Sequence, residues 1–390
     1  MSDDTNPIAA DPEKAHVVSQ WKHDSRLLSC RFDPLGRYVY TTAYDYTIQR
    51  WELATGTKTV LKAHDSWVRG LAFSPDGETL VSGGYDGRLI WWPVNGGDVT
   101  GESVAGEGVT EESATGEGVA GEGVAGEGVT GESVTEESAT GEGVTEKKIE
   151  PQRIVEAHDG WIRWVDINSD GSLVATGGND HLVKIWSFET GELVRSIAGH
   201  DRHIYSVHFH PSGESVFSGD LRGVVKQWSI ADGSEIATYD AKALYTENPG
   251  QAAEYGGVRS MDFDASENRL VCSGLHEAPN PFAGEQQPLV VVFDGSTHEE
   301  LHKFIAKEGL KCIAWRALFH PAGFILGACG GGGGGFLVFW RPDAETEFHR
   351  FKLPDTLRDM DLHPNGLLVA TAHNDEHVRI TRLSENQSAT

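Results

Sequence analysis

Four stretches of this chain repeat one pattern, in which a histidine precedes a closing tryptophan by 28 positions. The pairs are His23/Trp51, His64/Trp92, His158/Trp186 and His200/Trp228. A fixed period decides the architecture, because each repeat then forms one supersecondary unit that buries its apolar face against its neighbours. The sequence therefore predicts a repeat protein.

The pattern inside each unit is typical of β-strands. In the unit at 64–92, alternating apolar residues lead to a Pro-Asp-Gly turn, and two further apolar runs end at the tryptophan. A fourth β-like run precedes the next unit, as at 151–157. Three weaker units, 258–274, 315–330 and 357–375, close at Phe293, Trp340 and Thr381. The sequence thus predicts seven units of four short strands.

These units resemble WD40 repeats, the family of β-propeller blades with a GH…WD signature. The resemblance covers residues 15–383 apart from the insertions, although no closing Trp is followed by Asp. It implies an all-β, seven-bladed propeller of four-stranded antiparallel blades. It also implies that residues 15–21 supply the missing strand of the last blade and close the ring, since closure removes exposed sheet edges. Residues 1–14 and 384–390 are predicted to be disordered.

A set of His, Ser or Thr, Asp and Trp recurs at one spacing, and Ser–His–Asp taken alone suggests nucleophilic catalysis. A fold needs only one active site, so three copies favour a structural role. In the resembled family these side chains form a hydrogen-bonded tetrad through each blade, which satisfies half-buried polar groups. The predicted tetrads are His23, Thr41, Asp45 and Trp51; His64, Ser82, Asp86 and Trp92; and His158, Thr176, Asp180 and Trp186.

The tetrad weakens along the chain. In the fourth unit Arg222 occupies the Asp position, which leaves His200 and Ser218 without that carboxylate. This change is either ordinary drift, the interpretation we favour, or a release of Arg222 for binding. The seventh unit keeps Thr371 and Asp375 but lacks the His and the Trp at the aligned positions. No catalytic residue, metal site or cofactor is predicted.

Residues 99–148 parse as ten pentads such as VAGEG, with twelve Glu against two Lys and hence a net charge of −10. Acidic, glycine-rich sequence cannot bury enough apolar surface to fold. We therefore predict a disordered insertion, 97–150, between the third and fourth strands of blade 2. It is either a tandem expansion of no functional consequence, the interpretation we favour, or a tether for a partner. Six glycines at 330–335 predict a flexible turn in blade 6.

The resemblance implies that partners bind the face of the propeller that carries the entry loops. Alternation along the innermost strands predicts which of their residues reach this face, and the residue before the turn Asp adds Tyr44 and Tyr85. This face is rich in Arg, Trp and Tyr, the residues enriched in interface hot spots. The predicted partner-binding residues are Tyr44, Trp67, Arg69, Tyr85, Trp161, Arg163, Tyr205, Arg259, Trp315 and Arg358. Two insertions, 243–257 and 276–288, are expected on the same side.

The net charge of −27 argues against a general nucleic-acid binder, whose affinity comes from neutralising phosphates. No secretory signal or apolar run of membrane-spanning length is present, and the four cysteines form no CxxC pair. We therefore expect a cytoplasmic, monomeric, non-catalytic scaffold that binds proteins, such as a peptide or acidic partner, and no membrane. The alternatives are a hydrolase or lactonase-like propeller enzyme with a site in its central channel, and a scaffold in a nucleic-acid-associated complex.

Overall fold

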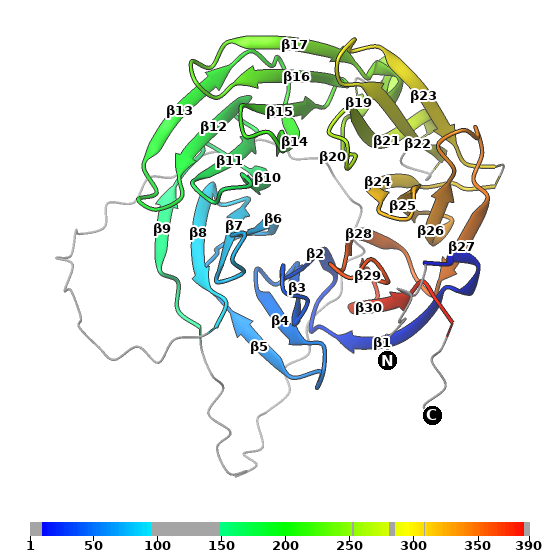
Figure 1. Cartoon of the computed structure of the whole chain (residues 1–390), viewed down its shortest axis with the longest axis horizontal. Helices are drawn as coiled ribbons and strands as arrows, with labels where there is room; N and C mark the ends of the chain where they lie inside the picture. The colour runs from blue at the N-terminus through cyan, green and yellow to red at the C-terminus, as the bar shows by residue number, and fades with distance from the viewer. Residues whose placement is uncertain (1–9, 96–148, 252, 281–284, 308, 386–390) are drawn as a thin grey trace, which may run out of the picture. The chain divides into compact units, whose positions relative to one another are not determined.

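The computed structural model of the protein describes residues 10–95, 149–251, 253–280, 285–307 and 309–385. Its strands form seven four-stranded antiparallel sheets arranged radially as the blades of a β-propeller (Figure 1). The predicted fold class is therefore confirmed. Within the described residues, no helix has the length and apolar character needed to cross a bilayer.

The blades follow one another along the chain. Blade 1 contains β2 (Leu27–Phe32), β3 (Tyr38–Ala43), β4 (Ile48–Glu52) and β5 (Lys58–Leu61), and blade 2 contains β6 (Val68–Phe73), β7 (Thr79–Gly84), β8 (Arg88–Pro93) and β9 (Arg153–Glu156). Blade 3 contains β10 (Ile162–Ile167), β11 (Leu173–Gly178), β12 (Leu182–Ser187) and β13 (Leu193–Ala198). Blade 4 contains β14 (Ile204–Phe209), β15 (Ser215–Asp220), β16 (Val224–Ser229) and β17 (Glu235–Asp240).

The weaker units form complete blades as well. Blade 5 contains β20 (Ser260–Phe263), β21 (Arg269–Asn280), β22 (Glu285–Asp294) and β23 (Glu300–Ile305). Blade 6 contains β24 (Ile313–His320), β25 (Phe324–Gly331), β26 (Gly334–Trp340) and β27 (His349–Leu353). Blade 7 contains β28 (Leu357–Leu362), β29 (Leu368–His373), β30 (His377–Arg382) and β1 (His16–Lys22).

The first strand of the chain completes the last blade, as the closure argument predicts. β1 pairs antiparallel with β30, from His16 opposite Arg382 to Lys22 opposite His377, and the blue and red strands lie side by side in Figure 1. The described structure begins before the boundary at residue 15 that we predicted. η1, a 3-10 turn at Pro12–Lys14, lies next to β1, and the amide of Asp11 donates to the carbonyl of Leu383 at 2.7 Å.

The innermost strands share a β-bulge near their first residues. In six blades the register against the second strand shifts by one residue, at Leu28, Arg69, Arg163, Tyr205, Trp315 and Arg358. A bulge re-aims the side chain of its extra residue. All six positions belong to the face on which the sequence predicts binding.

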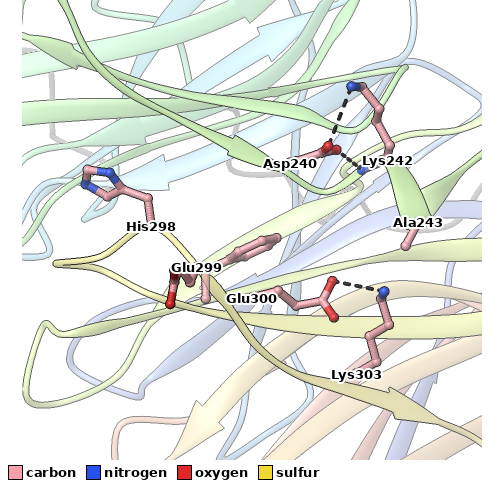
Figure 2. Close-up of a pocket in the computed structure, with 8 residues that line it drawn as sticks. Asp240, Lys242, Ala243, His298, Glu299, Glu300 and Lys303 are labelled. Carbon is pink, nitrogen blue, oxygen red and sulfur yellow. Dashed lines mark hydrogen bonds and ion pairs between the residues drawn. The ribbon is translucent and has the colours of Figure 1, made fainter.

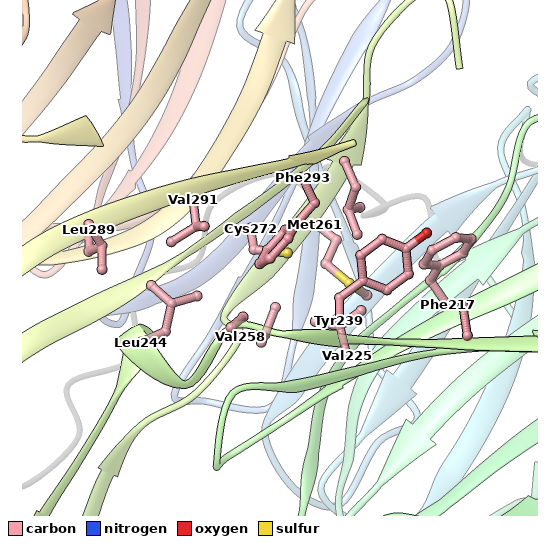
Figure 3. Packing of buried hydrophobic residues seen from close by; sticks show 13 residues of the cluster. Phe217, Val225, Tyr239, Leu244, Val258, Met261, Cys272, Leu289, Val291 and Phe293 are labelled. Carbon is pink, nitrogen blue, oxygen red and sulfur yellow. The ribbon is translucent and has the colours of Figure 1, made fainter. Parts of the chain in front are cut away.

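Apolar side chains from facing sheets fill the spaces between blades. Between blades 4 and 5, Phe217 and Tyr239 pack with Met261, Cys272 and Phe293 (Figure 3). Burying one such large side chain contributes about 1.5–3 kcal/mol. The four cysteines are buried and unbridged, in agreement with the absence of a CxxC pair. The core therefore lies between blades and holds the ring together.

The insertions lie where the sequence places them. Residues 242–257 form η2 (Lys242–Leu244), η3 (Pro249–Gln251) and a hairpin of β18 (Tyr245–Asn248) and β19 (Ala253–Gly256) between blades 4 and 5. β21 and β22 extend beyond their blade as a longer hairpin. The predicted disordered insertion lies outside the described residues except for its last two, of which Ile149 is buried in one cluster with Val94.

The six glycines span the turn between β25 and β26, with two at the end of β25, two in the turn and two at the start of β26, and close packing also requires Gly330 and Gly335. A Cβ on Gly330 would lie 1.9 Å from the carbonyl oxygen of Leu357, and one on Gly335 would lie 2.2 Å from that of Asp355. The hairpin thus lies against the backbone that enters blade 7. Glycine provides this approach because it has no side chain.

Candidate functional site

The ten residues predicted to bind a partner lie in one connected set of ring and guanidinium contacts, which we call the rim network. Its first half is aromatic. Tyr44 lies 4.5 Å from Trp67, and Trp67 lies 5.8 Å from Tyr85. Tyr85 stacks on Trp161 at 4.3 Å with an interplanar angle of 5°. These contacts connect blades 1, 2 and 3 through half-buried rings.

The second half of the rim network alternates guanidiniums with rings. Arg163 lies 5.2 Å from the Trp161 ring and 4.3 Å from that of Tyr205. Arg259 lies 4.2 Å from Tyr205 and 5.5 Å from Trp315. Trp315 is also approached by Arg358 of blade 7, at 5.2 Å, and by Arg69 of blade 2, at 5.6 Å. Since blades 2 and 6 are not neighbours, this last contact crosses the ring.

The bulges explain why these side chains meet. Arg69, Arg163 and Arg358 are each the extra residue of a bulge, as are Tyr205 and Trp315. Simple alternation predicts that Arg69, Arg163 and Arg358 share one face, and the structure brings them into one set of contacts. Alternation does not reveal the register shift, because a bulge leaves no mark in the apolar pattern of a single strand.

The arginines of the rim network have neutral hydrogen-bond acceptors. Arg69 donates to the carbonyl of Leu28 at 2.5 Å, and Arg163 donates to Asn179 at 2.6 Å. Arg358 donates to the amide oxygen of Asn374 at 3.2 Å. Among the residues that the structure describes, none of these three forms an ion pair with a carboxylate. Arg69, Arg163 and Arg358 therefore carry positive charge that no directly paired carboxylate of the described residues offsets.

The positive charges of the rim network lie close enough together to affect the protonation of Arg358. Burial and the neighbouring guanidiniums of Arg69, Arg259 and Arg26 lower the pKa of Arg358, against the opposing effect of Tyr44. Like charges held together in a partly buried place cost free energy that an incoming anion would recover.

A second polar cluster, not predicted from the sequence, lies deeper along the axis. The guanidiniums of Arg31 and Arg316 lie 5.3 and 5.6 Å from the Trp164 ring, although the three residues come from blades 1, 6 and 3. Arg31 pairs with Asp359 at 2.6 Å, and Arg316 pairs with Asp361 at 3.3 Å. Side chains thus span the central channel below the rim. No local pattern marks this cluster, because a bulge is not visible in one strand and the three residues come from different blades.

The aspartates of this channel also join blades. Asp361 accepts from the amide of Phe32 at 2.9 Å, and Asp262 accepts from that of Phe319 at 2.9 Å. Burial raises the pKa of Asp262 to about 6. In the described part of the chain, no group of three or more metal-binding side chains is placed to hold an ion.

The tetrads of blades 2 and 3 are continuous. In blade 2, Trp92 Nε1 donates to Ser82 Oγ at 2.8 Å, His64 Nε2 lies 2.8 Å from the same oxygen, and His64 Nδ1 lies 2.9 Å from Asp86. In blade 3, Trp186, Thr176, His158 and Asp180 are joined at 2.9, 2.6 and 2.9 Å. The carboxylates only accept, so each histidine donates from Nδ1 and receives the hydroxyl hydrogen at Nε2.

Blade 4 corrects the sequence analysis. His200 does have a carboxylate, because Asp220, two residues before the aligned position, lies 3.0 Å from its Nδ1. Ser218 Oγ lies 2.7 Å from His200 Nε2 and accepts from Trp228 Nε1 at 2.7 Å. Asp220 is the last residue of β15, and its side chain reaches the position that Asp86 reaches from the following turn. The tetrad is therefore complete in this blade.

Arg222 is also engaged, in a way that neither interpretation of it foresaw. Glu254 on β19 receives Arg222 at 2.6 Å, Arg202 at 2.8 Å and the hydroxyl of Tyr245 at 2.9 Å. Although partial burial opposes ionisation, these hydrogen bonds lower the pKa of Glu254 to about 2. Arg222 thus anchors the β18–β19 hairpin to blade 4.

Blades 1 and 7 differ from the predicted pattern. In blade 1, Trp51 Nε1 donates to Thr41 at 3.0 Å, but His23 Nε2 has no hydrogen-bond partner and Asp45 lies 3.5 Å from its Nδ1. The predicted tetrad is therefore interrupted at His23. In blade 7, His373 from β29 bonds to Thr371 at 2.8 Å and takes the place of the missing histidine.

A hollow at the outer edge of blades 4 and 5 is separate from the rim network (Figure 2). Its charged side chains pair with one another, Lys242 with Asp240 at 3.5 Å and Lys303 with Glu300 at 3.0 Å. No predicted site residue lines it.

Comparison with known proteins agrees with this architecture. The WD40 family pattern (WD domain, G-beta repeat) matches residues 16–52, 56–93, 149–187 and 191–229. The chain is 26% identical over 212 residues to nuclear distribution protein nudF of Emericella nidulans, which covers 50% of this chain and 48% of that protein. It is 34% identical over 206 residues to polyadenylation factor subunit 2 of Neurospora crassa, covering 51% of this chain and 29% of that protein.

A shorter match, 36% identical over 92 residues, is to ribosome assembly protein 4 of Chaetomium thermophilum and covers 20% of this chain and 18% of that protein. The matched segments span less than half the length of each relative. Four stretches of this chain match the WD40 repeat, and its seven blades share one construction, in agreement with the WD40-repeat family of β-propellers.

Proposed function

We propose that this protein is a non-catalytic scaffold that binds a peptide or acidic segment of a protein partner across its rim network. The observation that carries the proposal is the set of arginines without ion pairs at the rim of a chain with net charge −27. A local positive patch attracts an acidic partner in spite of the overall charge, because potentials act mainly within a Debye length of about 8–10 Å.

The half-buried aromatic rings between Tyr44 and Trp161 supply the apolar contact area of such a site. Aromatic and arginine side chains are the usual hot spots of protein interfaces. The names of the relatives point in the same direction, since one is a factor subunit and another an assembly protein. A cytoplasmic location and a monomeric state stay predictions from the sequence.

The test compares partners captured by the wild-type protein and by a variant with Arg69, Arg163 and Arg358 all changed to Gln. We expect the variant to lose its partners while its circular dichroism stays close to wild type. Because Arg163 is buried against Tyr205, the single variant Arg69→Gln separates loss of binding from loss of stability. Arg341→Gln is the matched control, because Arg341 is exposed and follows β26 at the end away from the rim network. This variant should retain the partners. Full retention of every partner by the triple variant would refute the assignment. Capture of nucleic acid instead of protein would favour the nucleic-acid-associated alternative.

A further inference from the structure

Three of the seven turns between the first and second strands of the blades, all of them among the described residues, begin with histidine and proline and end with glycine. They are 210–213, 320–323 and 363–366, in blades 4, 6 and 7. In each of them the histidine Nε2 lies within hydrogen-bond distance of a backbone carbonyl in the corresponding turn of the next blade. The pairs are His320 with Gly366 at 2.7 Å, His363 with Gly36 at 3.1 Å and His210 with Glu267 at 3.3 Å.

The partners of these rings fix their protonation. The amides of Ala322 and Asn365 lie 3.0 and 3.1 Å from the Nδ1 atoms of His320 and His363. Because an amide donates and a carbonyl accepts, Nδ1 carries no hydrogen and Nε2 carries the one that is donated to the next blade. The tetrad histidines of blades 2, 3 and 4 have the opposite tautomer, since they donate from Nδ1 to a carboxylate.

Two of the three contacts lie where the ring closes. Blade 7 combines β1 with β30, and it lies between blades 6 and 1 (Figure 1). His320 connects blade 6 to blade 7, and His363 connects blade 7 to blade 1. The His363 ring lies so near the blade 1 turn that a Cβ on Gly36 would be 2.3 Å from its Nε2. The series continues with Arg37, which donates to the carbonyl of Gly77 in blade 2 at 3.3 Å.

The surroundings of His320 disfavour a charged ring. His320 is buried and stacks on Phe324 at 4.2 Å, and the titratable side chain of the turn that it faces is that of His363. Burial lowers the pKa of His320, against the opposing effect of its hydrogen bond to Gly366. No carboxylate therefore compensates a proton on this ring among the influences on its pKa.

The charged groups around His363 are already paired with one another. They are Asp33 with Arg37 at 2.9 Å, in the turn that His363 faces, and Asp361 with Arg316 at 3.3 Å, from the strand before it. The ring itself lies edge-on to Phe32 at 5.0 Å. A second proton on His363 would place its Nδ1 hydrogen against the amide hydrogen of Asn365.

We infer that His320 and His363 form a pH-sensitive latch across the closure of the ring, which holds when both rings are neutral and weakens in mild acid. In the latched geometry a protonated ring leaves the amide two residues later without an acceptor and brings a charge into a buried place. Unfolded histidine takes up a proton near pH 6.5, while latched His320 resists it. The stability that the latch contributes is therefore present above about pH 6.5 and is lost as the pH falls below that value.

The first test compares melting temperatures of the full-length protein at pH 7.5 and pH 5.5. The double variant His320→Asn, His363→Asn removes both latches and introduces a residue that blade 3 uses in the same turn, where Asn168 accepts from the amide of Leu173 at 2.9 Å. We expect this variant to melt several degrees below wild type at pH 7.5, and less than about half as far below it at pH 5.5, where the wild type has lost the latch. Equal losses at the two pH values would overturn the inference.

Two single variants are matched controls. Arg37→Gln removes the contact with Gly77, and because arginine stays charged it should lower the melting temperature equally at both pH values. His349→Asn removes a histidine of β27 whose ring contacts Phe339 of its own blade, and should leave the pH dependence of wild type unchanged. If His349→Asn reduces the pH dependence as much as the double variant does, the effect is not specific to the latch and the inference is wrong.

Wild-type protein provides a test that needs no variant. After correction for the intrinsic pH dependence of hydrogen exchange, amide protection in β1 and β30 should fall about threefold or more beyond that in β11 and β12 of blade 3, whose turn contains Asn168. Nitrogen NMR of histidine-labelled protein at pH 7.5 should show the Nε2–H form at His320 and His363. A uniform loss of protection in all blades, or the Nδ1–H form at these two positions, would contradict the latch.

Discussion

A buried histidine has two ring nitrogens to satisfy, and in blades 2, 3 and 4 a hydroxyl and a carboxylate satisfy both. The carboxylate comes from a turn residue in blades 2 and 3 and from the end of β15 in blade 4. The carboxylate lies at the same position in space in all three blades, although in blade 4 it comes from a different position of the repeat. The hydrogen bond between histidine and carboxylate matters because an unsatisfied polar group inside a blade costs free energy.

We therefore predict that Asp220→Ala lowers the free energy of unfolding by about 1–3 kcal/mol, since His200 loses its acceptor. Asp86→Ala in blade 2 is the matched variant and should cause a loss of similar size. Chemical denaturation of both proteins measures the difference. If Asp220→Ala is as stable as wild type while Asp86→Ala is not, the fourth tetrad does not contribute.

His23 leads to a prediction about pH. Burial lowers the pKa of His23 to about 4, against the opposing charges of Asp45 and Asp24. Between about pH 6.5 and pH 4 the unfolded chain binds this proton and the folded protein does not, so stability falls as the pH falls through this range. From pH 7.5 to pH 5.5 this single group should remove about 1 kcal/mol. Urea denaturation at both pH values should show a smaller loss in His23→Gln, and an equal loss would exclude His23 as the source.

Among the structural elements, the blades and the β18–β19 hairpin show what sequence patterns can and cannot predict. The seven blades were predictable, because every unit repeats the same order of turns and alternating apolar runs. The turn within the six glycines was predictable as well. The β18–β19 hairpin was not, because its stability depends on Glu254 meeting two arginines from blade 4 that are 32 and 52 residues away in the chain. Nothing local indicates such a contact.

The candidate site likewise combines features that local patterns predict with features that depend on contacts between distant parts of the chain. Alternation placed the rim residues on one face, since side-chain direction is a local property of a strand. The contacts of Trp164 with Arg31 and Arg316 depend on which blades face each other across the ring. His373 was missed for a related reason, since it lies at the end of β29 and not in the loop before the innermost strand, where His64, His158 and His200 lie.

For the β25–β26 hairpin we predict that Gly330→Ala is strongly destabilising, by about 2 kcal/mol or more, because its methyl group would overlap the Leu357 carbonyl. Gly333→Ala, in the same turn, is the control and should cost much less, since its Cβ would lie 3.4 Å from the nearest atoms. Thermal unfolding of the two variants checks the prediction. Equal melting temperatures would show that the start of β28 moves aside without cost.

At the scale of the whole molecule, closure of the ring depends on the pairing of β1 with β30. We predict that deletion of residues 1–22 lowers the melting temperature by roughly 10 °C, because blade 7 then exposes an unpaired edge and loses several kcal/mol. Deletion of residues 1–9 alone should leave it near the wild-type value. Differential scanning calorimetry of the two truncated proteins distinguishes them, and an unchanged melting temperature after the longer deletion would argue against closure by β1.

The pairing of β1 with β30 also has a consequence for biosynthesis. β1 is translated first, yet its partner leaves the ribosome last, about 360 residues later. At a typical elongation rate of about 5–20 residues per second, β1 waits some 20–70 s with no strand beside it. Blades 1 to 6 are able to assemble in order during synthesis, while β1 stays without its partner strand. Completion of blade 7 is therefore the step that depends on every other blade having been synthesised.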